Sequence, residues 1–169
     1  NRIPYNFHRI NVAEFFADCV EDVGLDLESK NIQLNYSNLV EPDTRIIADP
    51  EQLKKVINNI IGNSIKYMDK EKGVIDIRLL DEVDSIRVEI EDNGKGIAQK
   101  DLQKIFERFY RTDASRNSAQ GGSGIGLSIV KKIVEDHGGY VWATAKEGEG
   151  TCMHFVLRKY IELQPGGTK

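Results

Sequence analysis

Apolar residues recur at helical spacing in three stretches of the chain, which predicts three long amphipathic helices. The first, about 12–29, follows Asn11, which forms a capping-box pattern with Glu14 three residues later. The second, about 50–68, begins with an Asp-Pro pair, a capping residue followed by proline at the first helical position. The third spans about 124–137.

Alternating apolar and polar residues predict strands with one buried face. These segments are about 32–36, 45–48, 74–80, 85–91, 140–145 and 151–158. A short helix is expected near Gln99–Ile105, before a long irregular segment, Phe109–Gly122. Long loops in compact domains often carry function, so this segment is a candidate lid. The elements together predict an α+β fold, a two-layer sandwich with the helices on one face of a mixed sheet.

Length and composition suit a single domain with a core. The chain has 169 residues and a net charge of −4, which argues against a nucleic-acid binder. It contains no apolar run of about 18 residues, the length of a membrane span, and residues 1–7 lack the pattern of a signal peptide. Cys19 and Cys152 show no metal-type spacing and are interpreted as small buried apolar residues of a cytoplasmic protein. Because the first residue is Asn1 and not Met, we expect a fragment of a longer protein.

One face of the second predicted helix is polar. At about 100° per residue, Asn59, Asn63, Lys66 and Tyr67 share this face, and the opposite face is apolar and suited to packing on the sheet. Asparagine is a poor helix former in helix interiors, so two of them on one face are notable. Taken alone, the polar face is equally typical of a helix side exposed to solvent.

A glycine-containing loop, Asp92-Asn-Gly-Lys-Gly-Ile97, follows the fourth predicted strand. Two glycines two residues apart allow backbone to approach a ligand without interference from Cβ atoms. A carboxylate at a strand end can accept a hydrogen bond from an exocyclic amine, which would select adenine over guanine. Taken alone, the segment is also typical of an ordinary turn.

A second glycine-rich segment, Gly121–Ser128, opens the third predicted helix. Backbone N–H groups at such a helix start form an anion site, which the helix dipole reinforces. The spacing matches neither the P-loop pattern nor the dinucleotide-binding pattern, and no signature of eukaryotic-type protein kinases is present.

Four motifs in order resemble the catalytic domain of sensor histidine kinases, part of a wider group with gyrase-type, chaperone and mismatch-repair ATPases. The motifs are Asn59-Ile-Ile-Gly-Asn-Ser-Ile-Lys-Tyr67, Asp92-Asn-Gly-Lys-Gly-Ile97, Ile105-Phe-Glu-Arg-Phe-Tyr-Arg111 and Gly122-Ser-Gly-Ile-Gly-Leu-Ser-Ile-Val-Lys131. The resemblance extends from about Ile10 to Leu157. It implies a Bergerat-type ATP-binding fold, with three helices on one face of a mostly antiparallel sheet of about five strands.

The resemblance also implies a division of the chain. Residues 1–10 would be a remnant of the linker from a domain that carries the acceptor histidine. Residues 11–160 would form the ATP-binding catalytic domain, and residues 161–169 a disordered tail.

By the same resemblance, the polar helix face binds magnesium and phosphate. Asn63 would give its side-chain oxygen to Mg²⁺, which takes its other ligands from phosphates and water. Asn59 would lie close to the water shell of the metal. Lys66 would neutralise phosphate charge, and Tyr67 would pack near the nucleotide.

The strand-end loop would recognise the base. Asp92 corresponds to the adenine-reading carboxylate of the family, and Thr151 to a residue that supports it. The base pocket would be formed by Gly94, Gly96 and Ile97.

The lid and the segment before it would contact the triphosphate. The residues that would close over it are Gly122, Gly124, Gly126 and Leu127. Arg111 corresponds to the family arginine that approaches the γ-phosphate, a task that suits the planar and permanently charged guanidinium. Arg108 and Arg116 lie on the same segment and are weaker candidates, equally consistent with solvated surface charge.

The implied activity is ATP-dependent phosphorylation of a protein histidine, with Arg111, Lys66 and Asn59 as the catalytic group. The γ-phosphoryl of Mg-ATP would pass to a histidine of a separate helical dimerisation domain of the same protein, and from there to a response regulator. His8, His137 and His154 lack the sequence context of the acceptor and are interpreted as structural. The fragment would contact neither nucleic acid nor membrane directly, as the cytoplasmic portion of a membrane-anchored kinase.

Three alternatives share parts of this pattern. An ATP-hydrolysing clamp of the gyrase or mismatch-repair type uses a general-base glutamate at the position of Asn59, and an amide cannot take a proton from water. A serine-directed anti-sigma kinase has the same fold with a different acceptor. A nucleotide-binding module without catalysis is the third, although every matched motif position is intact.

Overall fold

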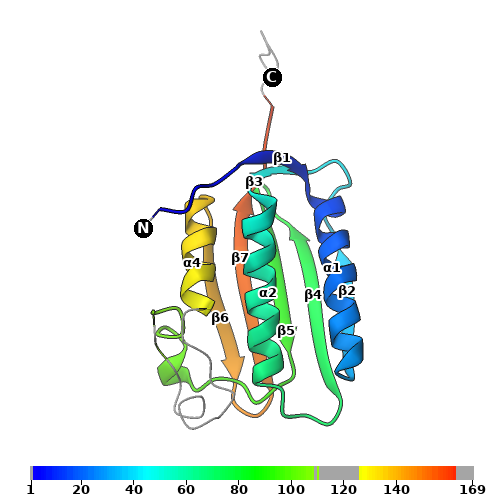
Figure 1. Ribbon diagram of the computed structural model, residues 1–169, viewed down its shortest axis with the longest axis vertical. Coiled ribbons are helices and arrows are strands. Elements are labelled where there is room, and N and C mark those ends of the chain that lie inside the picture. Colours follow the sequence, from blue (N-terminus) through cyan, green and yellow to red (C-terminus); the bar gives the residue numbers. More distant parts are fainter. Residues whose placement is uncertain (1, 109, 111–125, 163–169) are drawn as a thin grey trace.

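Three helices lie side by side across one face of a five-stranded sheet (Figure 1). The computed structural model describes residues 2–108, 110 and 126–162. The helices are α1 (Val12–Ser29), α2 (Pro50–Lys66) and α4 (Gly126–Asp136). The middle helix, α2, contacts both of its neighbours. The predicted two-layer α/β sandwich is confirmed.

The main sheet has the strand order β2-β4-β5-β7-β6. Its strands are β2 (Ile32–Asn38), β4 (Gly73–Asp81), β5 (Ser85–Asp92), β6 (Tyr140–Lys146) and β7 (Gly150–Arg158). Only the pair β2–β4 is parallel, and the other three pairs are antiparallel. The sheet is therefore mixed and mostly antiparallel, as predicted.

A separate two-stranded sheet lies across one end of the helical layer (Figure 1). It pairs β1 (His8–Asn11) with β3 (Arg45–Ala48) in antiparallel register. The sequence pattern predicts β3 but no strand before Asn11, because four residues are too few to show an alternating pattern. The pairing with β3, which is distant in the sequence, gives this segment its extended form.

The core lies between the helices and the inner face of the sheet. On β4, the alternate residues Ile75, Ile77 and Leu79 are buried. On β5, Ile86, Val88 and Ile90 are buried in the same way. These side chains form one apolar cluster with the buried faces of the helices, so the period-two pattern of both strands faces the layer above.

The first turns of α1 and α2 are capped as the sequence predicts. The Asn11 side chain accepts a hydrogen bond of 2.9 Å from the backbone N–H of Glu14. The Asp49 carboxylate accepts hydrogen bonds from the N–H groups of Glu51 and Gln52, 3.0 and 3.2 Å long. These bonds satisfy donors that a helix start leaves without partners.

Asp49 also joins the start of α2 to two other parts of the chain. Its carboxylate accepts a third hydrogen bond, 2.8 Å, from the N–H of Asn6. Its own N–H donates to Nε2 of His137, just beyond the end of α4, over 3.0 Å. The other ring nitrogen of His137 lies 2.8 Å from the carbonyl of Ile133, so both of its nitrogens have structural partners.

One segment differs from the predicted elements. Residues Gln99–Ile105 form a short 3₁₀ helix, η1 (Gln99–Asp101), followed by turns and not by a longer helix. Of the candidate lid, Phe109–Gly122, only Tyr110 belongs to the described residues. Within the described part of the chain, no helix combines the length and the apolar character needed to cross a membrane.

Candidate functional site

The polar face of α2 turns away from the core. Asn59, Asn63, Lys66 and Tyr67 are half-buried, whereas the residues on the opposite face are buried against the sheet. The helix ends at Lys66, and Tyr67 forms its C-cap. The partial burial of four polar or amphipathic side chains distinguishes this face from an ordinary solvated one.

Asp92 is a buried carboxylate at the end of β5. Only 6% of the residue is exposed. Its Oδ1 accepts hydrogen bonds from the backbone N–H of Gly94, at 2.9 Å, and from that of Thr151, at 3.3 Å. Ser64, on the buried side of α2, is hydrogen-bonded to the same carboxyl group. Burial raises the pKa of Asp92, and these hydrogen bonds offset only part of that effect.

The loop after Asp92 is fixed against the end of α2. The N–H of Lys95 donates to the carbonyl of Tyr67 over 3.0 Å. Gly94 lies so close that a Cβ at this position would meet that carbonyl oxygen at 2.5 Å. A side chain at this position would therefore clash with the backbone, which explains the glycine.

The same loop contacts the β6–β7 turn on its other side. Gly148 donates its N–H to the carbonyl of Lys95 over 2.7 Å. Gly96 has a φ of +76°, and a Cβ there would lie 2.4 Å from the carbonyl oxygen of Lys146. Ile97 is buried and belongs to the apolar core cluster. The loop thus begins at a polar site and ends in the core.

The start of α4 lies next to the middle of α2. A Cβ added to Gly126 would lie 3.6 Å from Oδ1 of Asn59. Leu127, the next residue, is half-buried. Gly122, Gly124, Arg111 and Arg116 lie outside the described residues. Arg108 is exposed in the turn that follows η1.

Three of these contacts involve α2 or Tyr67, the residue that caps it. Ser64 contacts Asp92, the Tyr67 carbonyl contacts the loop at Gly94 and Lys95, and Asn59 faces Gly126. In Figure 1 the end of α2, the beginning of α4, the loop after β5 and the β6–β7 turn lie toward the same end of the molecule. The structure therefore brings together three segments that are far apart in the sequence.

The donor set of this site suits magnesium and a nucleotide. Asn59 and Asn63 offer neutral amide oxygens, which are hard ligands of the kind that Mg²⁺ accepts when phosphates supply the negative charge. Lys66 adds a positive charge one turn beyond Asn63. Asp92 adds a buried acceptor whose second oxygen is not held by the backbone of the loop.

Two residues that contact this region have no role assigned from the sequence. They are Ser64, on the buried face of α2, and Lys95, in the loop after Asp92. A serine among buried apolar residues needs a hydrogen-bond partner, which was a usable signal for Ser64. Lys95 carries no such signal in the sequence, because its position depends on the fold of the loop.

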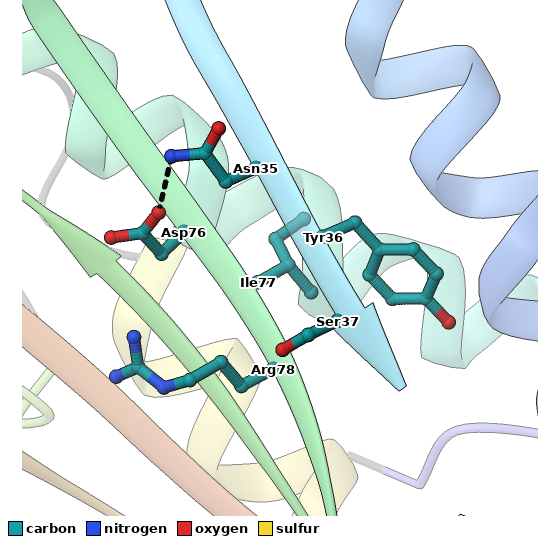
Figure 2. A pocket seen from close by; sticks show the side chains of 6 residues that line it. All are labelled: Asn35, Tyr36, Ser37, Asp76, Ile77 and Arg78. Atoms are coloured by element: carbon teal, nitrogen blue, oxygen red, sulfur yellow. Dashed lines mark hydrogen bonds between the residues drawn. The ribbon is translucent and has the colours of Figure 1, made fainter. Parts of the chain in front are cut away.

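A shallow pocket on β2 and β4 lies elsewhere. It has a volume of about 300 Å³ and is lined by Asn35, Tyr36, Ser37, Asp76, Ile77 and Arg78. Figure 2 shows Asn35 donating to Asp76 across the two strands, over 2.7 Å, while Tyr36 points the other way. None of the predicted site residues lines this pocket.

Another polar cluster lies on the sheet. Ligand-type atoms of Glu89, Cys152 and His154 lie within 4.8 Å of one another. However, Nε of Arg78 lies 3.0 Å from the Glu89 carboxylate, and His154 uses its second nitrogen with Thr144 at 2.9 Å. The negative charge is therefore already compensated within the protein, and both ring nitrogens of His154 have partners.

Comparisons with known proteins agree with the geometry. Residues 48–161 match the family described as histidine kinase-, DNA gyrase B- and HSP90-like ATPase. The sensor histidine kinase WalK of Bacillus subtilis (strain 168) is 39% identical over 156 residues, which are 90% of this chain and 25% of that protein. The sensor protein kinase WalK of Staphylococcus haemolyticus (strain JCSC1435) is 41% identical over 110 residues, 64% of this chain and 18% of that protein. The chain thus spans a quarter or less of the length of these curated relatives.

A solved structure shows the same arrangement of elements. The catalytic domain of histidine kinase ThkA, in a nucleotide-free form, superimposes with a TM-score of 0.76 at 28% identity. The match covers 90% of this chain and 95% of that domain. Family, fold and motifs agree, and the chain belongs to the histidine kinase-, DNA gyrase B- and HSP90-like ATPase family.

Proposed function

We propose that this chain is the catalytic domain of a two-component sensor histidine kinase. It binds Mg-ATP and passes the γ-phosphoryl group to a histidine on a separate helical dimerisation domain of the same protein. The observation that carries the proposal is the convergence on α2: Asp92, Gly94 and Gly126 all approach this helix or its cap. The sensor kinases among the relatives support the histidine kinase branch of the family.

Base recognition falls to Asp92. An ionised carboxyl group accepts hydrogen bonds and donates none. Adenine presents an amine where guanine presents a carbonyl, so this group favours adenine. The backbone N–H groups of Gly94 and Thr151 hold Oδ1, so the carboxyl group is fixed in orientation. Gly94, Gly96 and Ile97 form the adjoining wall.

Phosphate and metal binding fall to the polar face of α2 and the start of α4. Asn63 would hold Mg²⁺, with Asn59 beside it, and the bound metal would supply positive charge against the phosphate oxygens. Phosphoryl transfer depends mainly on positioning and on stabilising charge that spreads over the transferred group. Lys66, Arg111 and the N-terminus of α4 at Gly126 and Leu127 supply positive potential for this purpose.

The partners follow from the same proposal. The direct partner is the acceptor-histidine domain, and the response regulator receives the phosphoryl group from that domain. A structural neighbour, histidine kinase ThkA, has been solved in complex with the response regulator protein TrrA, with a TM-score of 0.73 and 28% identity to this chain. We place the domain on the cytoplasmic side of a membrane-anchored kinase, with residues 1–10 as the end of the linker.

Calorimetry with a non-hydrolysable ATP analogue tests nucleotide binding. We expect binding with Mg²⁺, much weaker binding after chelation of the metal, and weaker binding of the matching GTP analogue. Absence of binding in all three conditions would refute the proposal.

Phosphoryl transfer is tested by mixing the domain with the acceptor domain of its own full-length protein and γ-labelled ATP. The label should appear on the acceptor histidine. Arg111→Ala should keep ATP affinity and lose most of the transfer. If ATP is instead hydrolysed rapidly without labelling the acceptor, the clamp alternative holds.

A further inference from the structure

Two lysine side chains approach the same aromatic ring at the end of α2. Nζ of Lys66 lies 5.5 Å from the centre of the Tyr67 ring, and Nζ of Lys95 lies 5.3 Å from it. Lys66 is on α2, whereas Lys95 belongs to the loop after β5. Two separate elements therefore bring a positive charge to one ring.

The backbone of Lys95 is fixed on both sides. Its N–H donates to the carbonyl of Tyr67, and its carbonyl accepts from the N–H of Gly148 over 2.7 Å. A residue held in this way directs its side chain more narrowly than one in a free loop, which reduces the entropy lost when it binds a ligand. The point from which the Lys95 side chain extends is thus set by the fold.

Within the described part of the chain, neither ammonium group has an acidic partner. Among residues 2–108, 110 and 126–162, no carboxylate lies within ion-pair distance of Lys66 or Lys95. Nearby lysines differ: Lys70 is paired with Asp69 at 2.9 Å, and Lys146 with Glu149 at 3.5 Å. Two cations near one ring concentrate positive charge at this end of α2, which favours an anion there.

We propose that Lys95 is a second phosphate-binding cation of the nucleotide site, acting together with Lys66. The inference rests on the proposed function, because the anion is the phosphate chain of the bound nucleotide. An ammonium group has three donors and no acceptor, so it matches phosphate oxygens better than the mixed edge of a base. Lys95 therefore contributes to the affinity for ATP and not to the choice of base.

The test compares ATP, ADP and adenosine on four proteins by calorimetry: the unaltered chain, Lys95→Gln, Lys95→Arg and Lys54→Gln. Lys54 is exposed on α2, so its variant removes the same charge away from the site. We expect Lys95→Gln to weaken ATP binding about tenfold, the scale of one hydrogen bond to a charged group. Adenosine affinity should not change, ADP should fall between the two, and Lys95→Arg should restore most of the ATP affinity.

Salt gives an independent readout. The difference between the unaltered chain and Lys95→Gln should shrink as ionic strength rises, because screening weakens the contribution of the charge. Lys54→Gln should match the unaltered chain throughout.

Each contrary result has a distinct meaning. If Lys95→Gln binds ATP as tightly as the unaltered chain, Lys95 is not a phosphate ligand, while the proposed function stands. If adenosine affinity falls by the same factor as ATP affinity, Lys95 acts by holding Tyr67 and the inference is wrong. If the unaltered chain binds no nucleotide, the proposed function fails and this inference fails with it.

Discussion

Gly126, at the start of α4, faces the side chain of Asn59 in the middle of α2, with 3.6 Å between Oδ1 of Asn59 and a Cβ placed on the glycine. A small residue thus meets a polar one where two helices approach. The N–H groups at the start of a helix can bind an anion. The contact joins two motifs that lie 67 positions apart in the sequence. The proposed phosphate site therefore lies between α2 and the start of α4.

Replacement of Asn63 by alanine should remove metal-dependent nucleotide binding and leave the fold intact. The side chain is half-buried on the polar face of α2, and alanine is a better helix former than asparagine. We expect ATP affinity in the presence of Mg²⁺ to fall to the level measured after chelation. Titrations with and without EDTA measure this, and circular dichroism checks the fold. A variant that keeps its response to Mg²⁺ would show that the metal ligand lies elsewhere.

The two cysteines should resist alkylation in the folded protein. Burial is the main reason that the pKa is raised to about 11 for Cys19 and to about 12 for Cys152. Only the thiolate reacts, so at pH 8 its population falls to about one thousandth or less. Iodoacetamide labelling followed by mass spectrometry should find both thiols unmodified in native buffer and fully modified in guanidinium. Rapid labelling of either thiol in the native protein would contradict the assigned burial.

Asp49→Ala should destabilise the protein by about 2 kcal/mol, the upper end of the range for a lost N-cap. The carboxylate caps α2 and also holds Asn6, so the loss should affect the N-terminal segment too. Asp49→Asn keeps an acceptor at the cap and should cost much less. Urea unfolding of the three proteins gives these free energies. Equal stability of the alanine and asparagine variants would count against the capping role.

The same residue predicts a dependence of stability on pH. Burial works to raise the pKa of Asp49, but the hydrogen bonds from Asn6, Gln52 and Glu51 outweigh it and lower the pKa. A lowered folded-state pKa gives stability that is present above the unfolded value of about 3.9 and is lost as pH falls through the folded value. We choose pH 5 and pH 2, about either side of this window, for the measurement. Between them the free energy of unfolding should fall less for the Asp49→Ala variant than for the unaltered chain. An identical acid profile would show that Asp49 is not a main contributor.

The sequence predicted most of the fold because its signals are local. The caps at Asn11 and Asp49 and the alternation in β4 and β5 each depend on a few neighbouring residues. The strand β1 could not be predicted in this way, since it exists through its pairing with β3. The helix expected at Gln99–Ile105 is reduced to one 3₁₀ turn, because propensity over seven residues is a weak signal.

The candidate site divides along the same line. Asn59, Asn63 and Asp92 could be named in advance because they lie in sequence motifs whose order resembles that of the family. Ser64 and Lys95 could not, because their roles depend on which elements meet: Ser64 on the approach of α2 to β5, and Lys95 on contacts with Tyr67 and Gly148. The side-chain pattern along one helix does not encode such contacts.

Asp92→Asn should weaken adenine recognition while keeping or raising the stability of the free protein. The amide retains an oxygen for the N–H groups of Gly94 and Thr151, but it replaces the second acceptor with a donor that opposes the amine of adenine. We expect ATP affinity to fall at least about tenfold, the scale of one hydrogen bond to a charged group, and the preference for ATP over GTP to narrow. Competition between the two nucleotides, measured by calorimetry, tests this; unchanged preference would show that Asp92 does not read the base.

The predicted stability of the Asp92→Asn variant follows from the raised pKa of Asp92, which burial causes. A folded-state pKa above the unfolded value means that this carboxyl group favours the folded state below about pH 4, and that this contribution is lost as pH rises through the folded value. At pH 7 the free protein thus holds a buried charge at a cost, which asparagine removes. The melting temperature of Asp92→Asn should equal or exceed that of the unaltered chain at pH 7, and this advantage should shrink in acid. A variant that is less stable at pH 7 and also loses ATP would indicate that Asp92 holds the loop together, and the loss of binding would then follow from the loss of structure.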